Sequence, residues 1–135
     1  MIIDNVAYVD SVVAAVSGAY AVRPTVVYSG FSQGVAMAYR AAILGQAAAS
    51  GIMALAGDVP PELKTGETAT WPRVLVGRGT TDRHYTQAKM DTDVTFLGPR
   101  CKSLDTLVFS GGHEWHDDFR AAAGRLLRTL QGEEP

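Results

Sequence analysis

The sequence predicts an α/β fold, in which a mostly parallel sheet of about four strands is flanked by helices. Its 135 residues fit one domain that spans positions 1 to 135. Short runs of β-branched and apolar residues alternate with longer helix-compatible segments, and glycine or proline separates them. Strands buried on both faces of a parallel sheet have such continuous apolar runs, because neither face meets water.

The N-terminal segment predicts one helix and one strand. A helix is predicted over residues 4 to 20, where Gly18 helps to end it and valines recur at three- and four-residue spacing: Val6, Val9, Val13 and Val16. The run TVVYS at residues 25 to 29 follows Pro24 and is typical of a buried strand. A sharp turn is expected through residues 30 to 34.

The middle of the chain repeats this alternation. A helix of small and apolar residues is predicted at 35 to 44, and a buried strand at 51 to 56. Residues 60 to 71 begin with two prolines and are expected to form a loop. A third strand is predicted at 73 to 77, and a helix at 84 to 97.

The C-terminal part supplies one more strand and one more helix. A glycine and a proline at positions 98 and 99 precede the strand predicted at 105 to 109. The final helix is predicted from about 115 to 130, with one apolar face: Phe119, Ala122, Leu126, Leu127 and Leu130. Strands that alternate with helices imply parallel βαβ units whose sheet is covered on both faces.

The charges exclude several classes of partner. The formal net charge is −2 and charged residues are scattered, so no surface for nucleic acid or an anionic membrane is expected. Cys101 is the only cysteine, which excludes an intramolecular disulfide and argues against a cysteine metal site. Asp4 and Asp10 lie where a signal peptide carries positive charge. No apolar run approaches the length of a membrane span, so a cytoplasmic protein is expected.

A G-x-S-x-G pentapeptide, GFSQG, occupies positions 30 to 34 between a predicted strand and a predicted helix. In this context the motif is a tight turn that holds the serine in a strained conformation with its hydroxyl exposed. Ser32 is therefore the candidate nucleophile. The alternative is a loop serine that only caps the helix.

A serine hydroxyl is a poor nucleophile at neutral pH, so it needs a histidine base and a carboxylate that orients the base. His113 is the first choice for the base, because it follows the fourth strand, where active-site loops of an open parallel sheet lie. His84 and His116 are expected to have surface or supporting roles.

Two aspartates compete for the role of the acid. Asp82 follows the third predicted strand in GRGTTD, and Asp58 follows the second. Asp82 is favoured because the order Ser32, Asp82, His113 is the order serine, acid, histidine of α/β hydrolases. The alternative for Asp82 is a helix cap or a turn residue in a loop rich in glycine and threonine.

Three motifs carry a family resemblance: GFSQG at 30 to 34, GRGTTD at 77 to 82 and GGHEW at 111 to 115. In these motifs the sequence resembles the phospholipase/carboxylesterase branch of the α/β-hydrolase family. This branch is related to acyl-protein thioesterases and dienelactone-hydrolase-like proteins. The resemblance spans about residues 4 to 130 and implies that Ser32, Asp82 and His113 form the catalytic triad. It further implies hydrolysis of carboxylic esters through an acyl-enzyme, without metal or cofactor.

The departure from this family lies at the N-terminal end. Family members carry several strands and a helix before the nucleophile strand, whereas here one predicted helix precedes it. The resemblance implies that the N–H of Gln33, the residue after the nucleophile, is one oxyanion donor. The second donor comes from the part of the family fold that has no counterpart here, so we expect it to be missing. The strand at residues 25 to 30 would then lie at an open sheet edge. We therefore expect a homo-oligomer that forms through this strand or an adjoining apolar face.

The expected function is that of a serine carboxylesterase for small-molecule esters with short acyl chains, because nothing in the sequence resembles a lid or a long acyl tunnel. A thioesterase or a lysophospholipase stays open, since the triad does not define the leaving group. The alternative of a different class is a weak or inactive remnant of the fold that serves as a binding or assembly module. A nucleotide-binding domain ranks below both, because GFSQG lacks the required glycine spacing.

Overall fold

The computed structural model describes residues 2–20, 25–65 and 70–132. In these ranges four strands form one parallel sheet in the order β1-β2-β3-β4, which confirms the predicted α/β fold class. The elements in chain order are α1 (Ile2–Tyr20), β1 (Val26–Phe31), α2 (Gln33–Leu44), β2 (Ala49–Leu55), the 3₁₀ helix η1 (Pro61–Lys64), β3 (Trp71–Gly79), α3 (Gln87–Leu97), β4 (Cys101–Phe109) and α4 (Asp117–Gly132).

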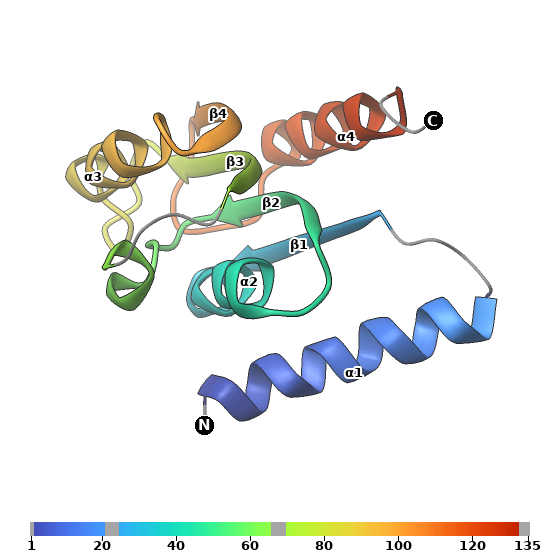
Figure 1. Ribbon diagram of the computed structural model, residues 1–135. Helices are drawn as coiled ribbons and strands as arrows, with labels where there is room; N and C mark the ends of the chain where they lie inside the picture. The colour runs from blue at the N-terminus through green and yellow to red at the C-terminus, as the bar shows by residue number, and fades with distance from the viewer. Residues whose placement is uncertain (1, 21–24, 66–69, 133–135) are drawn as a thin grey trace.

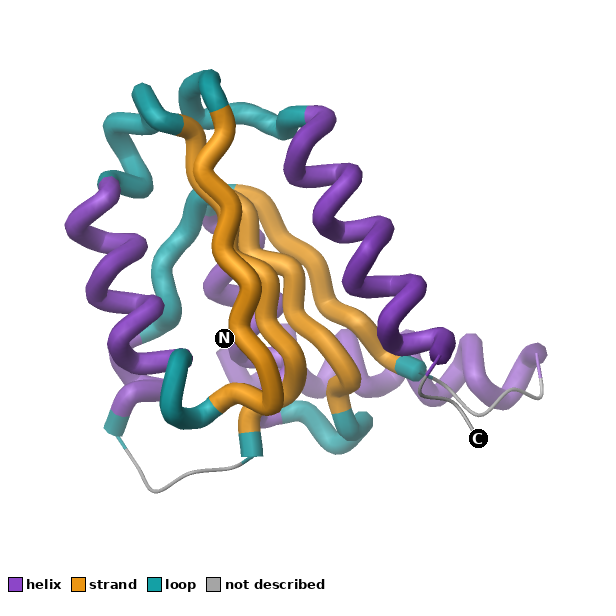
Figure 2. Tube along the Cα trace, turned by 90° about the horizontal axis from the view of Figure 1, so that it is seen from above, coloured by secondary structure: helices purple, strands orange, loops and turns teal. Residues whose placement is uncertain are grey.

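Helices cover both faces of the sheet. Helix α4 packs on one face, and α2 and α3 lie on the other (Figures 1 and 2). The two central strands, β2 and β3, carry the continuous apolar runs that the sequence shows, and both are mostly buried. Because all four strands are parallel, their carboxyl ends meet at one edge, where loops lead on to α3 and α4 (Figure 2).

Several boundaries differ from the prediction, most of all at β4 and in the segment before β3. Strand β4 begins at Cys101, which pairs with Trp71, rather than at position 105. Its first half has no apolar run because β4 is an edge strand with partly exposed side chains. The predicted loop at 60 to 71 contains η1 and the first residue of β3, and residues 66–69 lie outside the described residues.

Helix α1 is less buried than its valine spacing predicts. Val6 is the one buried residue among the four valines, and Val16 is 49% exposed. The helix also continues past Gly18 to Tyr20, and Pro24 lies outside the described residues. It lies beside α2 (Figure 1), where the carboxylate of Asp10 accepts the backbone N–H of Gln46 at 3.1 Å.

The length of α1 corrects one expectation. With 19 residues and a mean hydropathy of 1.3, it is long and apolar enough to cross a membrane, although no apolar run of that length was expected. Length and composition alone do not distinguish a span from a signal sequence or from a helix that packs against protein, since all three meet this criterion.

Candidate active site

Ser32 lies at the turn between β1 and α2, in a backbone conformation with φ 56° and ψ −118°. Residues other than glycine rarely adopt a positive φ, so the turn is strained at this serine. Its N–H donates to the carbonyl of Leu55 at 2.9 Å, which ties the turn to β2. The Ser32 side chain makes no capping hydrogen bond to α2, so the alternative of a capping serine is wrong.

The two glycines of GFSQG contribute unequally to this turn. A Cβ atom added to Gly30 would overlap the backbone of Gly34 and Val35. A Cβ atom added to Gly34 would meet no heavy atom within 4 Å. The close passage of strand and helix therefore requires a glycine at position 30 and tolerates a side chain at position 34.

His113 lies in the loop between β4 and α4 and connects the other two predicted site residues. Its Nε2 atom is 2.8 Å from Oγ of Ser32, and its Nδ1 atom is 2.9 Å from Oδ2 of Asp82. With the proton on Nδ1, the imidazole donates a hydrogen bond to the carboxylate and accepts one from the serine hydroxyl. The three residues follow three different strands, and the structure brings them into one hydrogen-bonded chain.

Asp82 is buried, at 4% exposure, and both of its oxygens have partners. Oδ1 accepts the backbone N–H groups of His84 at 2.8 Å and Tyr85 at 2.9 Å, while Oδ2 bonds His113. Burial raises the pKa of this carboxyl, but the hydrogen bonds from Tyr85, His113 and His84 outweigh it, and the pKa of Asp82 is lowered overall. Asp58, the rival acid, is exposed after β2, and Asp82 holds the position beside the imidazole.

The loop that carries Asp82 and the loop that carries His113 are in direct contact. The N–H and the hydroxyl of Thr81 both donate to the carbonyl of Gly111, at 2.9 and 2.8 Å. A Cβ atom added to Gly79 would overlap the carbonyl oxygens of Gly111 and Gly112. Glycine at position 79 therefore permits the close approach of the loops that carry Asp82 and His113.

Arg78, which is not among the residues predicted from the sequence, supports the loop that carries Asp82. The residue is 6% exposed, and its guanidinium donates to the carbonyls of Tyr85 and Asp82 at 3.0 and 3.3 Å and to the Gln87 side chain at 3.2 Å. These bonds and those of the Asp82 carboxylate occupy residues 82 to 87, so α3 begins at Gln87 rather than at position 84. An arginine within the apolar run VLVGRG is the local signal for such a role.

Tyr85 anchors the same loop from its side chain. Its buried hydroxyl donates to Oδ2 of Asp93 at 2.7 Å, and the same carboxylate receives Lys64 at 3.3 Å. Burial raises the pKa of Asp93, although the hydrogen bond from Tyr85 and the charge of Lys64 act in the opposite direction. The backbone donor that Tyr85 gives to Asp82 is thereby fixed in place.

The remaining histidines differ in position. The exposed His84 ring lies with its centroid 4.8 Å from that of His113, beside the hydrogen-bonded chain. His116 precedes α4 rather than lying inside it. There its Nδ1 accepts the Asp118 N–H at 3.0 Å, and its ring stacks on Phe109 at 4.5 Å.

An open cleft of about 360 Å³ adjoins Ser32 and His113. Gln33 borders this cleft, and its N–H belongs to the first turn of α2, where N–H groups have no partner within the helix. Among the described residues, no group of three or more His, Cys, Asp and Glu side chains is placed to hold a metal ion. The cleft is lined partly by charged and polar side chains: Arg40, Asp58, His84 and Lys89.

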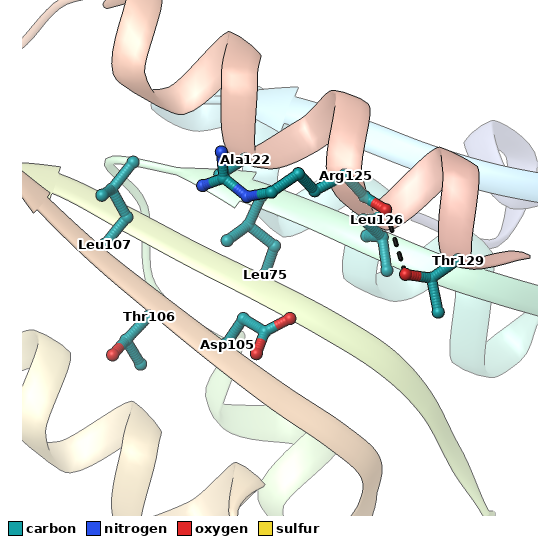
Figure 3. Close-up of a pocket in the computed structure, with 8 residues that line it drawn as sticks. All are labelled: Leu75, Asp105, Thr106, Leu107, Ala122, Arg125, Leu126 and Thr129. Atoms are coloured by element: carbon teal, nitrogen blue, oxygen red, sulfur yellow. Dashed lines mark hydrogen bonds between the residues drawn. The ribbon is translucent and has the colours of Figure 1, made fainter.

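A second cavity of about 320 Å³ lies between α4 and the strands β3 and β4 (Figure 3). Asp105 and Arg125 border it, and the Thr129 hydroxyl donates to the carbonyl of Arg125 at 3.0 Å. Asp105 lies in the middle of β4, away from the carboxyl ends of the strands. None of the three residues of the hydrogen-bonded chain lines this cavity.

Several solved structures share this fold. SOBER1 from Arabidopsis thaliana is 22% identical, with a TM-score of 0.76 over 96% of this chain and 64% of its own. A carboxylesterase from Bacillus cereus is 16% identical, with a TM-score of 0.74 over 94% and 61%. Acyl-protein thioesterase 2 from Zea mays is 18% identical, with a TM-score of 0.64 over 89% and 63%. The chain spans less than two thirds of each of these structures.

These similarities show that the chain has a fold of the α/β-hydrolase type. No family model and no protein of curated function matches the sequence.

Proposed function

We propose that the chain is a serine carboxylesterase that hydrolyses short-chain esters through an acyl-enzyme on Ser32. The observation that carries the proposal is the hydrogen-bonded chain from Asp82 through His113 to Ser32, which ends at an open cleft. A cleft of about 360 Å³ is at the small end of ligand sites, which favours short acyl groups. Two of the structural neighbours are named as a carboxylesterase and an acyl-protein thioesterase, which supports the same class of chemistry.

The reaction would proceed in two halves. Nε2 of His113 takes the hydroxyl proton while Oγ of Ser32 forms a bond to the ester carbonyl carbon, and Asp82 stabilises the imidazolium. The oxyanion faces the N–H of Gln33, and His113 returns the proton to the leaving alcohol oxygen as its bond to carbon breaks. Water then attacks the acyl-enzyme by the same steps, which releases the acid and restores Ser32.

Gln33 is the one oxyanion donor that we assign in the described part of the chain. Loss of one oxyanion donor typically costs about 3 to 4 kcal/mol of transition-state stabilisation. We therefore expect turnover to be roughly 100- to 1000-fold slower than in an esterase with two such donors.

A binding or assembly module is the second candidate. It is favoured by the single oxyanion donor, Gln33, that we assign among the described residues. In that case the strained turn at Ser32 would persist only as architecture.

Hydrolysis of p-nitrophenyl acetate and butyrate tests the proposal, with Ser32→Ala and His113→Ala beside the wild type. We expect turnover by the wild type and background rates for both variants. A fluorophosphonate probe, which forms an Oγ–P bond with loss of fluoride, should label the wild type and not Ser32→Ala. A wild type that neither turns over nor takes the label would favour the binding module.

A further inference from the structure

We propose that Phe31 and Trp115 form an apolar subsite, the aromatic shelf, that binds an apolar substituent of the ester. The inference rests on the proposed function and deepens it, because it defines the class of substrate. Phe31 precedes Ser32 in the chain, and its ring centroid lies 4.9 Å from that of His113 and 5.8 Å from that of Trp115. The shelf therefore begins in contact with the residues that would carry out the chemistry.

Trp115 is held in place and still open to solvent. Its ring packs edge-on against Phe119 at 5.9 Å, and Phe119 lies on the buried face of α4 with no exposed surface. The indole is nevertheless 43% exposed, in contrast to Trp71 of the core at 2%. An exposed aromatic ring with fixed neighbours offers apolar area at little cost in conformational entropy.

The shelf and the cleft both adjoin His113 and are lined by different residues. His84, with its centroid 4.8 Å from that of His113, belongs to the cleft, whereas the cleft lining includes neither Phe31 nor Trp115. Within the cleft, Lys89 Nζ donates to the carbonyl of His84 at 2.8 Å.

The cleft lining combines apolar side chains, such as Ala36 and Val59, with the charged side chains of Arg40, Asp58 and Lys89. An apolar substituent that lies on the rings of the shelf desolvates none of these charged groups. The arrangement points to esters with an apolar substituent on one side of the scissile bond, which would lie on the shelf, and a small substituent on the other, which would lie in the cleft.

The first test compares three substrates: ethyl acetate as the reference, ethyl hexanoate with an apolar acyl group, and 2-naphthyl acetate with an apolar alcohol. In Trp115→Ala, kcat/KM for one of the two apolar esters should fall about 3- to 10-fold more than kcat/KM for ethyl acetate. Trp115→Phe should restore most of the difference. Leu127→Ala is the matched control, because Leu127 is also 43% exposed but lies on the solvent side of α4. For this variant, kcat/KM for each apolar ester relative to ethyl acetate should equal the wild-type value.

The second test does not depend on turnover. Labelling of Ser32 with a fluorophosphonate that carries a long alkyl chain should shift the emission of Trp115 to shorter wavelengths, whereas labelling with a methyl fluorophosphonate should not. The shift should be absent in Trp115→Phe, because the remaining Trp71 is buried.

The two proposals fail in different ways. Absence of labelling and turnover contradicts the esterase itself. Labelling without an emission shift, together with equal ratios in Trp115→Ala, contradicts the shelf alone. Iodide quenching of Trp115 that weakens as the protein concentration rises would also overturn the shelf, since the ring would then be covered by a second copy of the chain.

Discussion

The Asp82 carboxylate has three hydrogen-bond partners. One of its oxygens holds the imidazole of His113, and the other binds two backbone N–H groups of its own loop. The same contacts that fix the loop therefore keep the carboxyl ionised, since hydrogen bonds from donors favour the charged form. At the level of single residues, the electrostatics and the loop conformation of this site cannot be separated.

The lowered pKa of Asp82 predicts how stability depends on pH. A carboxyl whose pKa is lower in the folded chain contributes stability above its ordinary pKa of about 3.9. This contribution is lost as the pH falls through the lowered pKa, because the unfolded chain binds the proton first. Urea unfolding at pH 7 and pH 3 should show that the wild type exceeds Asp82→Asn by a wider margin at pH 7. An equal margin at both pH values would contradict this assignment.

Arg78 provides a second prediction at this scale. Lysine cannot reproduce the planar three-donor geometry of arginine, so Arg78→Lys should loosen residues 82 to 87 and lower esterase activity about 10-fold. The free energy of unfolding should fall by about 1 to 3 kcal/mol. Arg73→Lys, in the same strand but bonded to Ser103 away from the cleft, should keep its activity. Equal losses in both variants would argue against a specific role for Arg78.

Among the elements, the β1–α2 turn makes the sharpest demand on sequence. Gly30→Ala places a Cβ atom against the backbone of α2, so it should destabilise the fold and abolish labelling of Ser32. Gly34→Ala lies in the open first turn of the helix and should stabilise the chain by about 0.5 to 1 kcal/mol. Thermal unfolding of the two variants tests the prediction. A similar fall in melting temperature in both would contradict it.

The elements that the sequence predicts best are those buried on two faces. The central strands β2 and β3 have continuous apolar runs, whereas the first half of the edge strand β4 has none and was missed. The start of α3 was misplaced because side-chain bonds from Arg78 and Asp82 replace the first helical turn. Such bonds join residues through their loop geometry, which a periodic pattern does not encode.

The candidate site also has a part that the sequence predicts and a part that it does not. Ser32, Asp82 and His113 were placed from motifs and from strand ends, because parallel strands bring their carboxyl ends to one edge. The neighbours of these residues were not. The contact between Phe31 and Trp115 joins residues far apart in the sequence, and it is defined only once β1 and α4 are packed.

At the scale of the whole molecule, apolar surface remains on one flank. Strand β1 is at the edge of the sheet, and on α1 the side chains of Ile3 and Tyr8 are 80% and 70% exposed. We propose that the chain self-associates through this flank, because an open edge and an apolar helix both gain by burial. Light scattering during size-exclusion chromatography should give a mass above 14.4 kDa at high micromolar concentration.

Two charge substitutions test where the contact lies. Ile3→Lys with Tyr8→Lys should lower the mass toward that of the monomer, because lysine resists burial. Leu127→Lys on α4 should leave the mass unchanged. A clean monomer in the wild type, or equal effects of both changes, would contradict self-association through α1 and β1.

The contact that Gly79 permits has a consequence for motion. Because Thr81 is bonded to Gly111, the loops that carry the acid and the base should fluctuate together as one rigid body. Ser32 belongs to a different body, since its turn is bonded to β2. Thermal motion should therefore change the distance from His113 to Ser32 more than the distance from Asp82 to His113. As the temperature rises, Nε2 of His113 and Oγ of Ser32 should spend a smaller fraction of time within hydrogen-bond distance.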